Sequence, residues 1–220
     1  MKLLALETAT EACSAAVWVD GAIVERYEIA PRRHAALIVP MVEAVLAEAG
    51  VTLQQLDGIA VGRGPGAFTG VRIAISVAQG LAFAADLPVA PVSTLAALAL
   101  GAARETGQTR IATALDARMG EVYWATWAAS ADSVTLVDEE RVCAPVLATA
   151  RCGDWFGIGS GWSAYAEALA QRLTVNGWLG ERYPRASDCA RLAAQPARRD
   201  LWVAAEQALP VYLRDQVVAG

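Results

Sequence analysis

The stretch 68–85, FTGVRIAISVAQGLAFAA, constrains the fold of this chain more than any other, because it reads as a helix with almost no polar surface. Beyond its first turn the polar side chains are Arg72, Ser76 and Gln79, which follow one another at the helical spacings of four and three. A helix packed on a sheet in a single subunit normally shows a broad polar face. We therefore expect the outer surface of this helix to meet a second protein.

The outer surface of this helix could instead be buried within the same chain. The helix predicted at 34–49 carries only Glu43 and Glu48 as charges, and it could bury the apolar helix together with a C-terminal helix near 201–209. Small residues such as Ala78 and Gly80 would allow close helix packing in either case. The residue types alone therefore do not decide between a second protein and the chain's own helices.

The first half of the chain reads as three strands followed by alternating helices and strands. Asp20-Gly21 is a strong hairpin signal, and Gly50 is a typical helix end. Pro40 should start or kink its helix. We predict strands at 2–7, 14–19, 22–29, 58–62 and 88–92, and helices at 34–49, 68–85 and from Ser93 or Thr94 to about 107.

The second half repeats this order. We predict strands at 111–116, 121–127, 134–141 and 155–159, a helix at 163–173, loops and short helices over 178–195, and a final helix at 201–209. A β-β-β-α-β-α plan used twice predicts an α/β, actin-like (ASKHA, ribonuclease-H-like) fold. We place its two lobes at 1–108, with the partner-binding helices, and 109–220.

Composition limits the classes of function. The chain is 55% hydrophobic with a formal net charge of −5, so it should not bind nucleic acid unaided, and the pairs Arg32-Arg33 and Arg198-Arg199 read as solvated surface. The start lacks an export signal, no stretch is judged long enough to span a bilayer, and four scattered cysteines suit a reducing cytoplasm. A single histidine excludes any site that needs two imidazoles.

Candidate chemical sites are few. The Gly62–Gly66 turn lacks the lysine of a phosphate loop, and it reads as a structural strand-to-helix turn. Glu7, Thr8 and Thr10 are weak candidates for nucleotide contact, because Ala9 stands where nucleotide binders of this fold have glycine. A lone actin-fold ATPase or kinase that uses Glu7 and Asp116 as metal-binding carboxylates remains the alternative function.

Nucleophilic catalysis has weaker support still. A Cys13–His34 or Ser76–His34 dyad would be needed for peptidase activity, and Asp116 with Glu121 could form a catalytic carboxylate pair. None of these pairs lies in a recognisable motif. We expect no catalytic residue and no metal site.

Several blocks of sequence, in order, resemble the TsaB (YeaZ) family: LETATEACSAAVW, GIAVGRGPGAFTGVRIAISVAQGLA, PVSTLAAL, ALDARMGEVYWA, GIGSGW and PVYLR. The resemblance implies a non-catalytic, cytoplasmic subunit of the bacterial machinery that makes N6-threonylcarbamoyladenosine (t6A37) in tRNA. The catalyst would be the paralogue TsaD, which has a His-x3-His metal site, and the ATPase TsaE would complete the set. tRNA would be reached only through that complex.

The resemblance also implies a contact surface. In the family, the first two helices of the first lobe pack on the equivalent pair of TsaD, or of a second TsaB when the chain is alone. It implies no intrinsic cofactor, and it leaves open whether ATP or ADP binds at the contact with TsaD. This chain has Glu7 where many members have Asp, and Ala67 where Ser is frequent. Both differences concern nucleotide contacts. The side chains we assign to the interface are Leu37, Met41, Val45, Thr69, Arg72, Ile75, Ser76, Ala78, Gln79 and Ala82.

Overall fold

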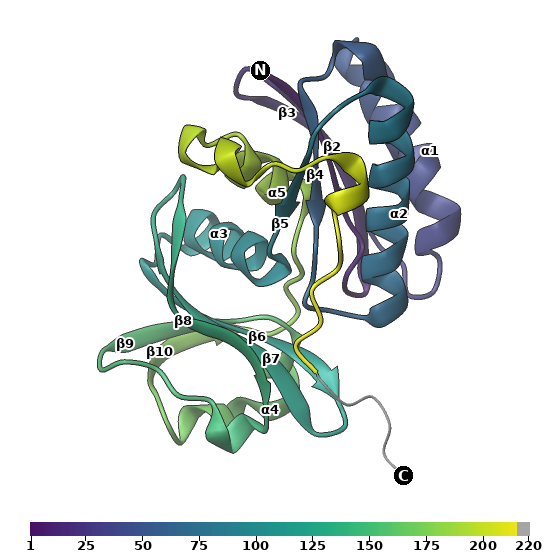
Figure 1. The fold of residues 1–220 in the computed structure, drawn as a ribbon. Helices are drawn as coiled ribbons and strands as arrows, with labels where there is room; N and C mark the ends of the chain where they lie inside the picture. The colour runs from purple at the N-terminus through teal and green to yellow at the C-terminus, as the bar shows by residue number, and fades with distance from the viewer. Residues whose placement is uncertain (215–220) are drawn as a thin grey trace. The chain divides into compact units, whose positions relative to one another are not determined.

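A computed structural model describes residues 1–214 of the chain and contains two five-stranded mixed sheets (Figure 1). The described part of the chain forms two compact units, Met1–Ala97 with Pro184–Pro210, and Leu98–Tyr183 with the segment that begins at Val211. The predicted lobes, 1–108 and 109–220, differ from these units, because the chain returns to the first sheet after residue 183. Residues 215–220 of the second predicted lobe lie outside the described residues.

The first unit is built on a sheet with the strand order β3-β2-β1-β4-β5. Its strands are β1 (Lys2–Glu7), β2 (Ala12–Val19), β3 (Ala22–Ile29), β4 (Gly58–Gly62) and β5 (Val89–Val92). β1 pairs antiparallel with β2 and parallel with β4. It is central and buried on both faces, which explains why its sequence is a continuous apolar run rather than an alternating one.

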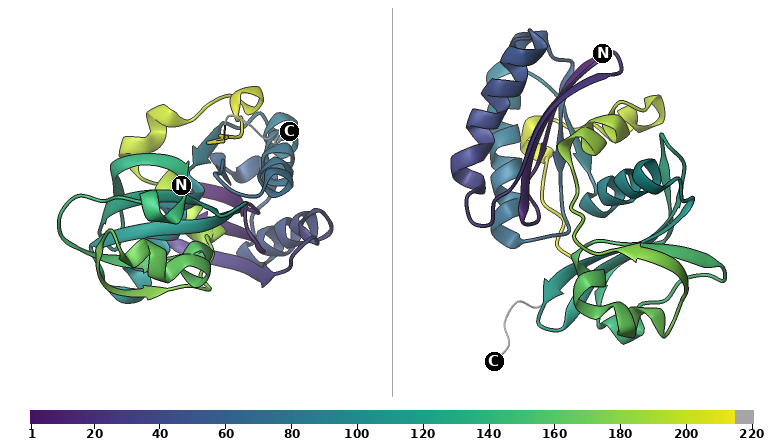
Figure 2. Two further views of the ribbon diagram at one scale, coloured as in Figure 1. Left: turned by 90° about the horizontal axis from the view of Figure 1, so that it is seen from below. Right: turned by 180° about the vertical axis from the view of Figure 1, so that it is seen from behind.

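Helices cover both faces of this sheet. α1 (His34–Ala49) and α2 (Phe68–Ala85) lie side by side on one face, and α5 (Ala186–Ala193) lies on the other (Figures 1 and 2). α1 ends at Gly50 in the left-handed conformation, as predicted. Pro40 lies inside the helix, so of the two effects predicted for this proline, the start of the helix is wrong.

The second unit repeats the strand order in its sheet, β10-β9-β6-β7-β8. Its strands are β6 (Arg110–Arg118), β7 (Glu121–Ala129), β8 (Val134–Cys143), β9 (Asp154–Ile158) and β10 (Thr174–Leu179), and α4 (Ser160–Ala170) packs on the sheet. α3 (Thr94–Thr106) contains the division between the units. Trp124 and Trp162 are buried in this unit with ring centroids 6.2 Å apart.

Two sequence predictions for the C-terminal half are wrong. β10 is absent from the predicted strands, because Asn176 and Gly177 interrupt its apolar pattern, and the pairing with β9 shifts register there. The helix expected at 201–209 is absent from the described residues; short 3-10 turns η3 (Pro196–Leu201) and η4 (Ala205–Gln207) take its place. Between them Val203 pairs with Val89 at the edge of the first sheet, which demands extended backbone.

Glycines at four-residue spacing let α2 approach the β1–β2 turn. A Cβ on Gly66 would overlap Ala9, and a Cβ on Gly70 would overlap the carbonyl of Thr8. The approach is fixed by hydrogen bonds, in which the Ala67 amide donates to the Ala9 carbonyl at 2.7 Å and Thr8 Oγ1 donates to the Gly70 carbonyl at 2.6 Å. α2 is therefore anchored at its first turn.

We expect Gly70→Ala to destabilise the protein by about 1–3 kcal/mol, since the added methyl overpacks a backbone contact. Gly80 lies on the same helix with open space around its Cα, so Gly80→Ala is a matched control that should stabilise by about 1 kcal/mol through helix propensity. Urea unfolding of both variants checks the difference. Equal effects at the two positions would contradict the close approach of α2.

Candidate functional site

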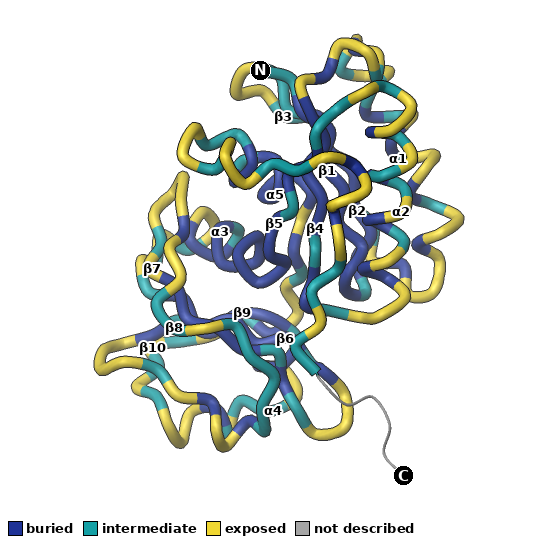
Figure 3. Tube along the Cα trace, in the orientation of Figure 1, coloured by how far each residue is buried: buried dark blue, intermediate teal, exposed yellow. Residues whose placement is uncertain are grey.

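The outer face of α1 and α2 is the candidate site, because it carries exposed residues whereas the strands behind it are largely buried (Figure 3). Of the ten side chains assigned to the interface from sequence, Thr69, Arg72 and Ser76 are exposed. Leu37, Met41 and Gln79 are half-buried. The polar stripe therefore points outward, as expected of a helix face that the sheet does not cover.

The other four assigned residues do not reach the surface. Val45, Ile75, Ala78 and Ala82 are buried in the core between the helices and the sheet. The sequence does not distinguish the inward apolar side of α2 from its outward apolar side, since both are hydrophobic. Their assignment to a contact surface is corrected: they support the face from beneath.

A groove of about 460 Å³ runs between the two helices on this face. None of its apolar lining residues is among the interface residues predicted from sequence, although a 3.6-residue period would identify them once the buried side of each helix is known. The Arg72 guanidinium lies over the Phe68 ring at 3.6 Å from its centroid. The groove is lined by Ala35, Ile38, Phe68, Thr69, Arg72, Ile73, Ser76 and Val77.

Apolar surface continues beyond the groove. Phe83 on α2 is 84% exposed and Val39 on α1 is also largely exposed, and Phe68 in the groove lining is 51% exposed. Two exposed aromatic rings on one helix mark a contact surface better than scattered aliphatic residues do. The face therefore combines an apolar groove with aromatic anchors.

The C-terminal segment covers only one part of α2. Gln79 Nε2 donates to the Ala208 carbonyl at 3.0 Å, and Ala205 and Ala208 join the core of the first unit. The sequence left open that other parts of the same chain bury the apolar helix. This is correct around Gln79, where the 3-10 turn η4 covers α2 in place of the predicted α-helix. Arg72 and Ser76 remain exposed.

The turn after β1 holds the three candidates for nucleotide contact, Glu7, Thr8 and Thr10, and all three are buried. Glu7 Oε1 accepts the Ala9 amide at 2.7 Å, and Oε2 accepts the Thr94 hydroxyl at 3.1 Å. The Cys189 thiol lies 3.9 Å from the same Oε2. The amide that could face a phosphate is therefore already bonded to the chain's own carboxyl.

Close packing holds the Glu7 carboxyl in this position. A Cβ on Gly62 would overlap Oε2, so the glycine leaves room for the carboxyl. Burial raises the pKa of Glu7 to about 7, although hydrogen bonds from Ala9, Thr94, Thr8 and Cys189 act to lower it. Glu7 is thus a buried acid whose two oxygens already accept hydrogen bonds from the chain.

The remaining catalytic candidates are engaged elsewhere. Cys13 and His34 are both buried, and burial raises the pKa of the Cys13 thiol to about 11, which opposes the thiolate a nucleophile requires. Asp116 accepts the Arg118 amide at 2.8 Å, and Glu121 pairs with Arg214. Among residues 1–214, no three His, Cys, Asp or Glu side chains are grouped to hold a metal ion.

One helix in the described part of the chain, α2, is long and apolar enough to cross a membrane by length and composition. The helix includes Arg72, and its uncharged part, 73–85, falls short of the about 18 residues that a span needs, as expected from the sequence. One third of the helix is buried in the structure, where it packs on β4 and β1. Length and composition alone are weak evidence for a span.

Known proteins resemble this chain over most of its length. A model described as TsaD, tRNA N6-adenosine threonylcarbamoyltransferase, matches residues 25–177. A protein of Escherichia coli K12 named tRNA threonylcarbamoyladenosine biosynthesis protein TsaB is 43% identical, over 99% of this chain and 96% of that protein. The chain belongs to the TsaB family. The TsaB of Haemophilus influenzae Rd is 37% identical over 99% of this chain and 95% of its own length.

A solved structure extends the agreement to the fold. YeaZ from Pseudomonas aeruginosa matches with a TM-score of 0.91 and 49% identity, covering 96% of this chain and 99% of that one. The resemblance found from sequence blocks is therefore confirmed. The prediction of an α/β, actin-like fold is confirmed as well, with the two sheets of matching strand order.

The buried carboxyl makes a prediction about stability and pH. The pKa of Glu7 is raised from 4.5 to about 7 on folding, so ionisation of Glu7 opposes folding, and stability is lost as pH rises from about 4.5 through 7. The loss amounts to about 3 kcal/mol at 1.36 kcal/mol per pKa unit. Glu7→Gln, which cannot ionise, should remove this part of the pH dependence.

Urea unfolding of both proteins between pH 4.5 and 8 measures the effect. The free energy of unfolding of the native protein should fall relative to that of Glu7→Gln as the pH rises. Parallel curves for the two proteins would show that the carboxyl is not buried as described.

Proposed function

We propose that this chain takes part in making N6-threonylcarbamoyladenosine in tRNA, as a non-catalytic cytoplasmic subunit that binds a TsaD-type catalytic protein through α1 and α2. The observation that carries the proposal is the apolar groove between these helices, which Phe68 lines, together with the exposed Phe83 on α2. Membership of the TsaB family supports the pathway, because relatives are named for tRNA threonylcarbamoyladenosine biosynthesis. A TsaE-type ATPase would join the same assembly.

The physical case for a partner rests on what the helices expose. Apolar groove walls and open phenylalanine rings lose unfavourable contact with water when a second helix pair packs on them, at about 25 cal/mol per Å² buried. Ala35 and Ser76 are small enough to let a facing helix come close. When no TsaD-type protein is present, a second copy of the chain can cover the same face.

The alternative function, an actin-fold ATPase or kinase that acts alone, is less well supported. The Ala9 amide is bonded to Glu7, and Asp116 is paired with Arg118, so both proposed metal-binding carboxylates are already engaged. A chain with one histidine also lacks the His-x3-His site of the catalytic paralogue. ATP or ADP can still lie at the contact with the partner, where both chains would supply groups.

A single substitution in the groove tests the contact. Ser76 is exposed and lines the groove, so Ser76→Arg places an unpaired charge where the partner would exclude water. We expect retention of a tagged TsaD-type protein to fall at least 100-fold, about 3 kcal/mol, without loss of thermal stability. Biolayer interferometry measures the change.

The matched control is Ala164→Arg, which adds the same side chain to an exposed position of α4 in the second unit. It should bind the partner as the native chain does. Partner binding by Ser76→Arg at native strength would refute the assigned surface. Buried positions such as Ile75 are unsuitable for this test, because a charge there would disrupt the core.

A further inference from the structure

The hairpin between β6 and β7 closes with a turn whose backbone conformation its residues disfavour. Met119 and Gly120 lie between the two strands with φ angles of 56° and 76°, and Arg118 before them has a φ of 63°. A positive φ brings the Cβ of an L-residue too close to the following carbonyl oxygen, so glycine, asparagine and aspartate are favoured there. Long side chains held at such positions point to a function for them.

Another two-residue hairpin turn of this chain has the usual residues. Asp20 and Gly21 join β2 to β3 with φ angles of 46° and 101°. Both turns have a positive φ at two consecutive residues, the pattern for which Asp-Gly and Asn-Gly are the preferred sequences. Met119 therefore occupies a position where an aspartate or an asparagine would be more favourable for the backbone.

The packing of Met119 within the described residues does not explain its presence in the turn. Met119 is 72% exposed. Its sulfur lies 3.6 Å from Nη1 of Arg214, but a thioether is a weak hydrogen-bond acceptor. Arg214 makes stronger bonds through Nη2, to the Glu121 carboxylate at 2.5 Å and to the Ala117 carbonyl at 3.2 Å. Arg214 therefore does not depend on the sulfur for its position.

The chemistry at the tip of this hairpin suits an apolar socket in a protein. The unbranched thioether side chain of Met119 is flexible and polarisable, so it adapts to apolar surfaces of varied shape. The charges around it are paired within the chain, Arg118 with Asp116 at 2.9 Å and Arg214 with Glu121. Two cations and two carboxylates leave no excess charge at the tip for a phosphate group or an acidic partner.

We propose that Met119 inserts into an apolar socket of the TsaD-type partner, as a contact additional to the α1–α2 face. The inference rests on the proposed function, which supplies the partner. The groove on the α1–α2 face is lined by eight residues, whereas a stable interface takes about 20–30 residues from each protein. The partner therefore has to touch further parts of this chain, and an exposed methionine held in an unfavourable conformation fits such a contact.

Met119→Asn tests the contact by separating stability from binding. Asparagine tolerates a positive φ and lacks the apolar bulk, so the variant should melt about 1–3 °C higher than the native chain in differential scanning calorimetry. Its affinity for a tagged TsaD-type protein should fall about tenfold, measured by biolayer interferometry with the full chain. A turn without a binding role would gain stability and lose no affinity.

Two further variants control for the change in the turn. Met119→Leu keeps an apolar side chain of similar size but removes the sulfur contact with Arg214, and it should bind the partner within about twofold of the native chain. Asp20→Asn places the same asparagine in the β2–β3 turn, where the native side chain is 71% exposed. It should leave the affinity for the partner unchanged.

Native-strength partner binding by Met119→Asn would overturn the proposal, and so would equal losses for Met119→Asn and Met119→Leu, because the socket would then not be apolar. A lower melting temperature for Met119→Asn would also contradict it, since the native turn would not be strained. Failure of the proposed function looks different: the native chain would not retain the TsaD-type protein, or Ser76→Arg would bind it at native strength. Loss of binding confined to Ser76→Arg would keep the α1–α2 face as the contact and reject Met119.

Discussion

The close contact between the β1–β2 turn and the first turn of α2 is the interaction on which the first unit depends. Gly66 and Gly70 allow backbone to meet backbone there, and the Ala67 amide and Thr8 hydroxyl complete the contact. This contact fixes where α2 begins, and with it the position of Phe68 and Arg72 at the mouth of the groove. A larger residue at either glycine would force apart the turn and the helix that presents the candidate site.

The same contact changes what the turn can do. In a nucleotide-binding chain of this fold, the turn after the first strand keeps its amides free for phosphate. Here the Ala9 amide donates to Glu7, the Ala9 carbonyl accepts from α2, and Thr8 is bonded to Gly70. The polar groups of the turn are thus used to hold the fold together.

The regular parts of the fold can be predicted from sequence because local signals and global packing agree there. The hairpin at Asp20-Gly21, the helix end at Gly50 and the bounds of α2 all follow from single-residue chemistry. Prediction fails at β10 and η4, where a bulge near Gly177 and the long-range pairing of Val203 with Val89 decide the backbone. No local pattern encodes those contacts.

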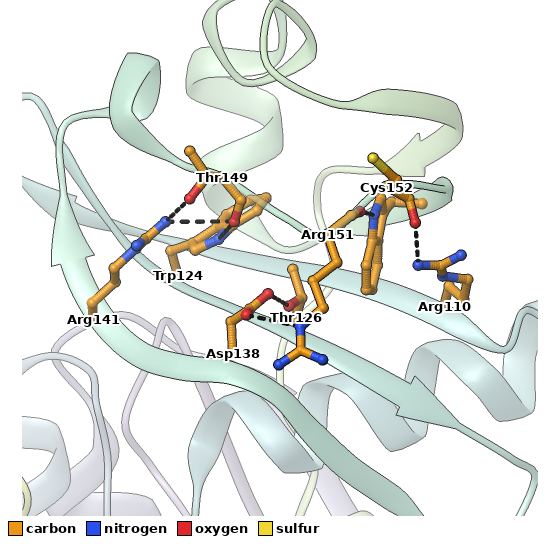
Figure 4. A network of polar contacts seen from close by, with 9 residues as sticks. Arg110, Trp124, Thr126, Asp138, Arg141, Thr149, Arg151 and Cys152 are labelled. Atoms are coloured by element: carbon orange, nitrogen blue, oxygen red, sulfur yellow. Dashed lines mark hydrogen bonds and ion pairs between the residues drawn. The ribbon is translucent and has the colours of Figure 1, made fainter.

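In the candidate site, too, some features can be predicted from the local sequence and others cannot. The stripe of Arg72 and Ser76 faces outward as its spacing predicts, yet Ile75 and Ala78 on the same helix are buried, because an all-apolar helix does not reveal which side meets the sheet. The contacts of Arg110, Arg141 and Arg151 with the loop 149–152 and with Asp138 (Figure 4) cannot be seen in the sequence for another reason: they form only when β8 and its following loop fold onto the sheet. A face built on one helix can be found in part from a periodic sequence, whereas a network assembled from three separate segments requires the tertiary structure.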